Sequence, residues 1–456
     1  MKTGTIQSLI DVLEQAFCNL NLDIPAEELE DLAITIHKAM SVEGRHYHTP
    51  EHVLSLSDSN NPIQSLAAFF HDIVYYQVDR GFSSEVMDII SPYIGFDPRN
   101  ESEMFLVSQA RPDDLCFRVT LDIFNFTAGQ KLYDAPGFNE FLSALVMGKK
   151  LHPLLPEKIL LQIIVYIEAT IPFRGKNEFG VGPFETLEAR LKKACRDHQI
   201  PMTQDEIVQT IQGAVVFANK DVENFSEKDP AMFLCNTWKL LPENNLALRS
   251  GQIYSVRDYR QALQRTDKHL DIIKPESIFH SYKGVPPNEE YLERLSYARK
   301  NIETARAYLG VKLLNIAILE ALADVTGGDA PLSLFMGDVG HNGDDARRLE
   351  NILPPVQLHP TVDPNSILYE LLESGRGAPA DFNDLKNAPL SLFLYQSLGP
   401  ERVQYYLQYA REMFDGDLQP EKFLETIDAG ILSTIAEVCA RMVLTRSEKL
   451  LRYVKK

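Results

Sequence analysis

Histidines and an aspartate with the spacing of metal ligands are concentrated near the N-terminal end of the chain. Residues 45–52 read RHYHTPEH, and residues 70–72 read FHD. The whole chain has only 11 histidines, and four of them lie within these two short stretches. Imidazole and carboxylate ligands together suit divalent ions such as Zn, Mn, Fe or Mg. The spacing therefore predicts a site for a divalent metal.

The residues around these histidines indicate how the chain could present them. Thr49, Pro50 and Glu51 are typical of a helix start, with a cap, a proline at the first helical position and an acid in the first turn. His48 would then precede a helix and His52 would lie in its first turn, so the two side chains can enter one cavity and do different work.

His71 and Asp72 follow in the nearly all-apolar run of residues 66–75, LAAFFHDIVY. Burying an imidazole and a carboxylate there is costly unless they are paired or bound to a metal. His71 alone could be an ordinary core histidine, but the adjacent pair favours a functional site.

A second carboxylate for the same site is Asp221. Residues 215–225, VVFANKDVENF, end an apolar helix pattern with a group of polar side chains. By itself, Asp221 fits better as a residue of a helix-terminal turn.

Taken together and in this order, the motifs YHxxxH, HD and ANxDVxN resemble those of the HD superfamily of metal-dependent phosphohydrolases. The resemblance is closest to bacterial predicted HD phosphohydrolases that begin with RxYHxxxH. The first and last motifs also resemble class I cyclic-nucleotide phosphodiesterases. The agreement extends over about half of the chain and implies an HD-type helical bundle.

The resemblance assigns roles to single residues. It implies four protein ligands for one or two divalent ions (Mn, Fe, Zn or Mg), with Asp72 as the bridge between two ions: His52, His71, Asp72 and Asp221. It implies that His48 is not a ligand but the general acid that protonates the leaving oxygen. Glu85 would hold a metal-bound water, although a solvated surface position is an equal alternative.

Three further residues are candidates for substrate binding. Arg45 flanks the first motif and could contact a phosphate, or could simply lie at the surface. Thr170 could hydrogen-bond a metal water, and Arg174 could bind phosphate oxygens through two parallel hydrogen bonds. The alternative for these two is a helix end broken by Pro172.

Two other functions stay open beside hydrolysis of a small phosphate ester. One is a non-catalytic sensor that binds a nucleotide or a metal at the same site. The other is an HD-type diiron oxygenase, which needs two more histidine ligands that only His152 and His198 can supply. Tyr75 stands where phosphodiesterases have a further histidine.

Composition limits the class of protein and its partners. The formal net charge of −19 argues against nucleic-acid binding and against an anionic membrane surface. Five cysteines without a CxxC pair favour free thiols in a reducing cytoplasm. The N-terminal stretch lacks the pattern of a signal peptide, and no run of 18 apolar residues predicts a transmembrane helix.

Helical periodicity dominates, so the fold class we predict is all-α without a β-hairpin. We expect a metal-dependent domain over residues 1–285 and a helical domain of unknown role over 286–456, which could gate the first or mediate formation of a homo-oligomer. Residues 324–366 are rich in Gly, Pro and Asp and form a long connection. The helical patterns cover residues 5–20, 25–40, 64–78, 100–110, 138–148, 156–169, 183–197, 204–219, 256–271, 288–323 (as one helix or two joined near 308–310), 400–413, 420–427 and 429–453.

Overall fold

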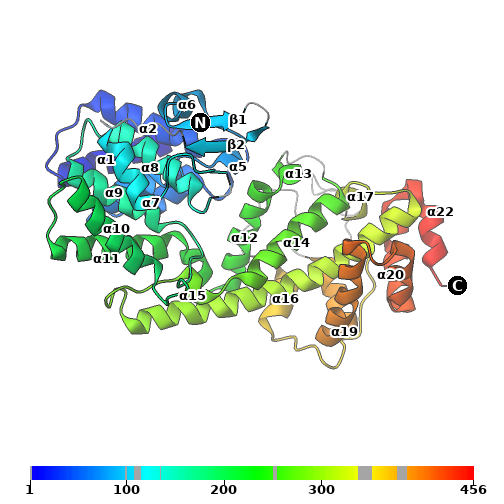
Figure 1. Ribbon diagram of the computed structural model, residues 1–456. Helices are drawn as coiled ribbons and strands as arrows, with labels where there is room; N and C mark the ends of the chain where they lie inside the picture. The colour runs from blue at the N-terminus through cyan, green and yellow to red at the C-terminus, as the bar shows by residue number, and fades with distance from the viewer. Residues whose placement is uncertain are drawn as a thin grey trace. The chain divides into compact units, whose positions relative to one another are not determined.

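The computed structural model describes residues 3–97, 100–106, 114–133, 135–249, 254–336, 352–376 and 388–455, and α-helices dominate it (Figure 1). Helix accounts for 69% and strand for 3% of the structure. The predicted all-α class is therefore confirmed. Residues 337–351, in the middle of the Gly- and Pro-rich connection, lie outside the described residues.

The chain divides into two compact units, and both are discontinuous in sequence. The first unit comprises Met1–Phe225 and Lys274–Ser296, and the second comprises Ser226–Ile273 and Tyr297–Lys456. This division differs from the single domain boundary after residue 285 that we expected from the sequence. The segment Lys274–Ser296 packs with the first unit, and the chain then returns to the second.

The first unit is a helical bundle with one small hairpin. Its elements are α1 (Thr3–Asn19), α2 (Ala26–Met40), α3 (Pro50–Leu56), α4 (Pro62–Phe70), α5 (Tyr76–Asp79), α6 (Ser84–Ile90), β1 (Ile94–Asp97), β2 (Asn100–Leu106), α7 (Leu115–Phe124), α8 (Phe138–Leu151), α9 (Glu157–Ala169), α10 (Pro183–Asp197), α11 (Gln204–Asp221) and α15 (Pro275–Ile278). The short 3-10 helix η1 (Glu223–Ser226) follows α11.

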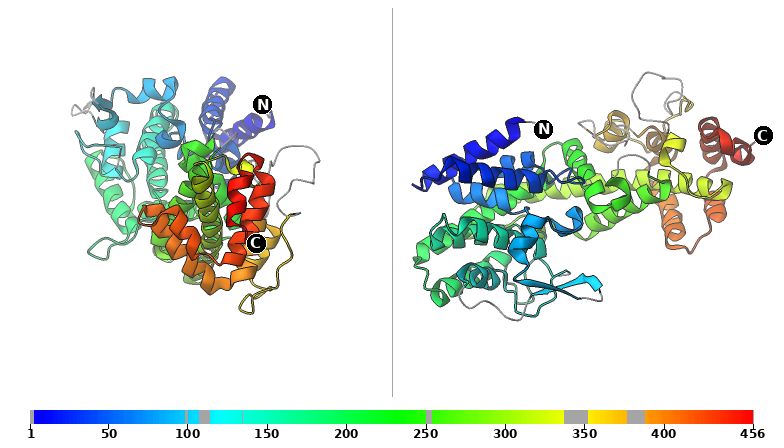
Figure 2. Two further views of the ribbon diagram at one scale, coloured as in Figure 1. Left: turned by 90° about the vertical axis from the view of Figure 1, so that its right-hand side faces the viewer. Right: turned by 90° about the horizontal axis from the view of Figure 1, so that it is seen from above.

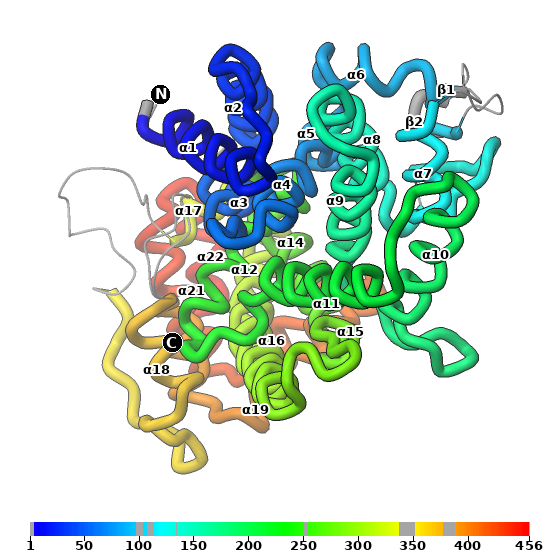
Figure 3. The backbone as a smooth tube through the Cα atoms, turned by 90° about the vertical axis from the view of Figure 1, so that its left-hand side faces the viewer, coloured from blue at the N-terminus to red at the C-terminus, as the bar shows by residue number. Residues whose placement is uncertain are grey.

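Helix α9 is the centre of this bundle and packs against α4, α8 and α11 (Figure 3). Its sequence is apolar on most faces, which is typical of a helix surrounded by others, and almost every residue from Leu160 onward is buried. Helix α4 is equally apolar and is buried from Gln64 to its end at Phe70. The HD dipeptide thus follows directly on one of the most buried segments of the unit.

Helix α11 delivers its last turn to a defined place because both of its ends are held. A capping box between Thr203 and Glu206 begins the helix. At the other end, the Asn219 side-chain amide donates to the carbonyl of His280 at 2.8 Å and accepts from its N–H at 2.9 Å. The segment Lys274–Ser296, which contains His280, is thereby tied to the end of α11.

The predicted helix over 64–78 is interrupted after Phe70, and only the short α5 follows. The reason is that side chains of α8 take the backbone N–H groups that a continuing helix would use. Val74 donates to the Ser143 hydroxyl at 3.1 Å, and Tyr76 donates to the Asn139 side-chain oxygen at 3.1 Å. Asp72 therefore lies in a loop and not on a helix.

A second prediction was wrong, because residues 100–106 form a strand and not a helix. β1 and β2 pair as an antiparallel hairpin, with Ile94 opposite Leu106, so the expectation of a fold without a β-hairpin is also wrong. Met104 and Leu106 are buried, which is the two-residue alternation of a strand, and a short apolar run fits both periods. The remaining residues of that predicted helix, 107–110, lie outside the described part of the chain.

The second unit is also helical. The helix α16 (Asn288–Thr326) runs into it from the first unit as one continuous helix, without the break considered near 308–310 (Figure 2). The other elements are α12 (Pro230–Asn244), α13 (Leu246–Arg249), α14 (Val256–Ile272), α17 (Leu332–Met336), α18 (Ile367–Ser374), α19 (Pro389–Asp415), α20 (Pro420–Thr426), α21 (Ala429–Met442), η4 (Leu444–Arg446), α22 (Ser447–Leu450) and η5 (Leu451–Tyr453). The sequence patterns did not predict α12 or α18, and α12 even contains Pro242.

Two general features of the described residues agree with the composition. No helix in the described ranges is both long and apolar enough to cross a membrane. None of the five cysteines, all of which lie in described segments, forms a disulfide bond.

We predict that Asn219→Ala destabilises the protein by about 1–3 kcal/mol, because it leaves two backbone groups of His280 without their partner. Urea unfolding followed by circular dichroism measures the change. The control is Asn60→Ala at an exposed position, which we expect to be neutral. Equal stability of the two variants would contradict the role of Asn219 as a clamp.

Candidate metal centre

The four predicted ligands come from three helices of the first unit. His52 lies in the first turn of α3, which begins at Pro50 as predicted, with Thr49 at the N-cap position. His71 and Asp72 follow the end of α4, and Asp221 is the last residue of α11. Helices α3, α4 and α11 pack on one another, and this brings the four side chains together.

His52, His71 and Asp72 form a group compact enough for a metal ion, and Asp221 lies close to both imidazoles. Asp221 Oδ1 lies 3.3 Å from Nε2 of His52 and 3.3 Å from Nε2 of His71. Asp72 Oδ2 lies 2.9 Å from His71 Nε2 and 4.0 Å from His52 Nε2. Ligand atoms at normal metal distances of about 2.0–2.2 Å lie about 3–3.5 Å from one another in tetrahedral or octahedral geometry. The ligand atoms of His52, His71 and Asp72 all lie within 4.8 Å of one another.

Two buried nitrogens in this cluster also indicate a ligand that is not part of the chain. Nε2 of His52 and Nε2 of His71 are buried and have no hydrogen-bond partner of acceptable geometry, whereas buried polar atoms normally have one. His71 Nδ1 lies 2.9 Å from the carbonyl oxygen of Ala68. A carbonyl can only accept, so Nδ1 carries a proton, and Nε2 is the nitrogen that would present a lone pair to a metal ion once the ring is neutral. Two imidazoles and two carboxylates thus fit a divalent ion of the Zn, Mn or Fe type.

The charges of the four groups depend strongly on one another. Burial alone would lower the pKa of His71, but the carboxylates of Asp72 and Asp221 outweigh it and raise that pKa well above its ordinary value. Burial alone would raise the pKa of Asp221, but the neighbouring His71 and His52 lower it to about 2. The pKa of Asp72 is likewise lowered by the histidines against the effect of burial. Both carboxylates are therefore ionised, as metal binding requires.

His48 lies beside this cluster and remains accessible. Its Nε2 is 3.8 Å from Asp72 Oδ2, and 16% of the side chain is exposed. Its ring contacts the rings of Tyr47, Tyr75 and His52, with centroid distances of 5.1, 5.0 and 5.7 Å. This is a position from which an imidazole can reach a bound substrate.

Arg45 was a candidate for phosphate binding, but its guanidinium is buried and engaged inside the protein. It forms two hydrogen bonds with the carboxylate of Asp79 and a third with the backbone carbonyl of Asp72. The side chain has no exposed surface. The structure therefore places Arg45 among the groups that support the site.

The polar atoms of Thr170 and Arg174 are likewise used near the end of α9. The Thr170 hydroxyl donates to the carbonyl of Ile167 at 2.8 Å. Arg174 pairs with the buried Glu168 at 2.7 Å, and Arg190 pairs with the same carboxylate at 2.5 Å. These contacts give Thr170 and Arg174 a role in the local structure. That either residue contacts a substrate stays a prediction.

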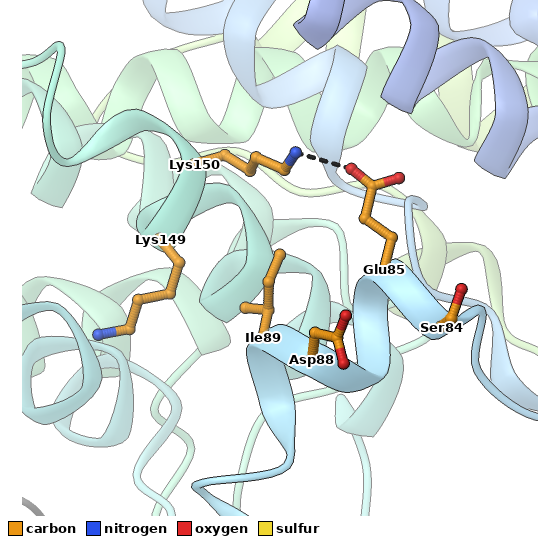
Figure 4. Close-up of a pocket in the computed structure, with 6 residues that line it drawn as sticks. All are labelled: Ser84, Glu85, Asp88, Ile89, Lys149 and Lys150. Carbon is orange, nitrogen blue, oxygen red and sulfur yellow. Dashed lines mark hydrogen bonds and ion pairs between the residues drawn. The ribbon is translucent and has the colours of Figure 1, made fainter.

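Glu85 lies in the first turn of α6, and its carboxylate accepts from Lys150 at 2.7 Å and from Thr35 at 2.9 Å. These hydrogen bonds lower the pKa of Glu85 although burial acts in the opposite direction. The residue lines an open hollow between α6 and α8, in which Lys150 points toward it (Figure 4). The described contacts thus join Glu85 to α2 and α8, and its role in holding a metal-bound water stays a prediction.

The sequence analysis missed Glu140, a half-buried acid in the first turn of α8. Asn139 and Ser143, on either side of it in sequence, bind the backbone that follows Asp72, so this end of α8 faces the site. Burial and the charge of Asp72 raise the pKa of Glu140 to about 7. A detectable signal was the group of polar residues, Asn139, Glu140 and Ser143, within an otherwise apolar helix pattern.

Comparison of this chain with protein-family models, with curated proteins and with solved structures gave no match. The interpretation of the centre therefore depends on its own residues and their geometry.

We predict that the purified protein binds about one or two divalent ions per chain, and that Asp221→Ala removes them because one of the four proposed ligands is lost. Elemental analysis of the two proteins after supply of Mn, Fe, Zn or Mg measures this. Asp229→Ala, a variant of an N-cap aspartate at the start of α12, is the control and should retain the metal. A wild type that stays empty with every ion would refute the site.

We also predict that Glu140 makes the metal-free protein less stable at high pH. A carboxyl whose pKa is about 7 in the fold and 4.5 ordinarily is harder to ionise when folded, so stability falls as the pH rises through this window. Glutamine cannot ionise, so Glu140→Gln does not lose stability in this way. From about pH 5 to about pH 8, the free energy of unfolding of the variant should therefore rise by about 1–3 kcal/mol relative to that of the wild type.

Denaturant unfolding in the presence of a chelator gives both stabilities. Glu157→Gln, at an exposed acid that also lies in the first turn of a helix, is the matched control. Added Mn²⁺ should reduce the pH dependence of the wild type, because a nearby cation favours the ionised carboxylate. If the wild type and Glu140→Gln show parallel pH profiles, Glu140 does not face the site.

Proposed function

We propose that this protein is a metal-dependent phosphohydrolase or phosphodiesterase of the HD type that acts on a small phosphate ester. The observation that carries the proposal is the convergence of His52, His71, Asp72 and Asp221 around one point, with accessible His48 beside them. An HD-type bundle for the first unit is part of the same proposal.

The four ligand side chains would hold a divalent ion between them. Such an ion supplies a Lewis acid for the phosphoryl oxygens and lowers the pKa of a water molecule toward neutrality. Asp72 and Asp221 would orient the ion by their fixed positions at the ends of α4 and α11, and the Ala68 carbonyl would keep His71 in the tautomer that can ligate.

His48 is the best candidate for the proton donor to the leaving oxygen. Its ring lies next to the ligands, and its accessibility allows contact with a substrate. The neighbouring rings of Tyr47 and Tyr75 restrict its orientation, which is what a positioned general acid requires. Glu140, with a pKa of about 7, is a second group that could exchange a proton near neutral pH.

The charge pattern favours a small substrate. A net charge of −19 disfavours a long polyanion such as nucleic acid. A single phosphate ester, in contrast, interacts mainly with the local field, which a bound cation reverses. A nucleotide or a related small phosphate fits this requirement.

Of the two alternative functions, the diiron oxygenase receives less support from the geometry. For a diiron oxygenase, His198 would be needed as a ligand, but its Nε2 lies 2.7 Å from a carboxylate oxygen of Asp122. His152 is the C-cap residue of α8 and is exposed. A non-catalytic sensor would use the same ligands, and the behaviour of His48 variants distinguishes it from an enzyme.

We predict that His48→Ala lowers kcat by about 100- to 10,000-fold while the metal content stays the same, because the variant lacks the proton donor but keeps the ligands. Hydrolysis of bis(4-nitrophenyl) phosphate and of 4-nitrophenyl phosphate in the presence of Mn²⁺ measures kcat. His37→Ala on α2 is the control and should retain activity. A metal-loaded wild type without activity toward any phosphate ester would favour the sensor.

A further inference from the structure

Arg45, in the loop before α3, and Asp79, the last residue of α5, form a largely buried ion pair beside the candidate metal centre. We infer that this pair holds His48 and Asp72 in position relative to each other, so that Arg45 is a positioning residue for the centre. The inference rests on the proposed function, since it concerns the affinity of this site for a metal ion.

The guanidinium of Arg45 makes three directed hydrogen bonds, two to the last residue of α5 and one to the loop after α4. Nε and Nη2 donate to the two carboxylate oxygens of Asp79 at 2.8 and 2.6 Å. Nη1 donates to the backbone carbonyl of Asp72 at 2.8 Å. The paired geometry toward Asp79 is the strong, directional form of an arginine–carboxylate interaction, and it directs the third N–H at Asp72.

Asp72 depends on such support because it lies outside regular structure. Helix α4 ends at Phe70, and the next helical turn begins at Tyr76. A carbonyl in this stretch has no regular helical partner, and the carbonyl of Asp72 accepts from Arg45 instead. The carboxylate of the same residue is the group that lies 2.9 Å from His71 Nε2.

Arg45 is also connected to His48, through the chain and through Tyr75. Arg45 precedes His48 by three residues in the turn between α2 and α3, and its guanidinium lies 6.0 Å from the ring centre of Tyr75. Tyr75 contacts the ring of His48, and its N–H donates to Asp79 at 3.4 Å. One ion pair therefore orients the loop of His48 and the loop of Asp72 together.

Arginine is required here by its shape and not only by its charge. Lysine carries the same charge on a single nitrogen and cannot bind both oxygens of Asp79 and the Asp72 carbonyl with the same planar geometry. Arg45→Lys thus preserves the buried charge and removes the fixed geometry. This separates a positioning role from simple charge balance.

The test is the Mn²⁺ affinity of the chelator-treated full-length chain, measured by electron paramagnetic resonance of the free ion and without any substrate. We expect Arg45→Lys and Asp79→Asn each to weaken the affinity by about 10- to 100-fold, the usual effect of groups that orient metal ligands. The visible absorption of bound Co²⁺, which reports ligand geometry, should shift in both variants. A general loss of stability would not shift it.

The matched control is Arg260→Lys in the second unit. Arg260 also forms a two-fold hydrogen-bonded pair with a buried carboxylate, that of Glu320, at 2.9 and 3.1 Å. This variant should bind Mn²⁺ like the wild type. If Arg45→Lys does not fold, Asp79→Asn decides the question, because it keeps Arg45 and changes only the carboxylate that orients the guanidinium toward Asp72.

The outcomes separate this inference from the proposed function. Native Mn²⁺ affinity and a native Co²⁺ spectrum in the Arg45 and Asp79 variants would overturn the inference, as would an equal loss in Arg260→Lys. A wild type that binds Mn²⁺ but hydrolyses no phosphate ester would refute the proposed function alone. A wild type that binds no divalent ion would refute both.

Discussion

The first unit is organised around two carboxylates that face two imidazoles in a largely apolar interior. Each of these groups would be costly to bury by itself, and each is stabilised by the opposite character of its neighbours, as the raised pKa of His71 and the lowered pKa of Asp221 indicate. Because the attraction between them depends on short distances, the three helices that bear them must end at fixed positions. The caps, the clamp of Asn219 and the interruption after Phe70 all serve that requirement.

The interruption after Phe70 shows how a helix is ended without a proline or a glycine. Ser143 and Asn139 of α8 bind backbone N–H groups of residues 74 and 76, and Arg45 binds the carbonyl of Asp72. The polar groups of the loop are thus satisfied by side chains from two other segments. This arrangement allows the charged side chain of Asp72 to lie inside the bundle just beyond the end of α4. Its side chain points in a different direction from that of a residue within the helix.

Much of the helical architecture and the grouping of the four candidate residues could be predicted from the sequence, for different reasons. Helices such as α1, α8, α9 and α11 have apolar periodicity over many residues, which is a strong local signal. His52, His71 and Asp72 belong to short motifs with unusual polar residues in apolar surroundings. Asp221 could be predicted only through the order of several motifs, since its own surroundings resemble any helix end.

The failures have physical causes that the local sequence does not contain. The hairpin of β1 and β2 is short, and its apolar residues fit a helix as well as a strand. Arg45 and Arg174 have the chemistry to bind phosphate, but whether a guanidinium is exposed depends on which acid the fold places beside it, Asp79 for Arg45 and Glu168 for Arg174. Glu140 becomes significant only because the fold places the start of α8 beside Asp72, which lies 68 positions earlier in the chain.

The return of Lys274–Ser296 to the first unit has a consequence for how the protein is made. The residue that clamps the end of α11, His280, is synthesised only after the whole segment Ser226–Ile273 has been synthesised. The second unit is therefore interleaved with the first in the order of translation, and the first unit cannot be completed as a simple N-terminal fragment. Any shortened version of it would need a new linker in place of residues 226–273, so that the clamp reaches Asn219 from the same chain.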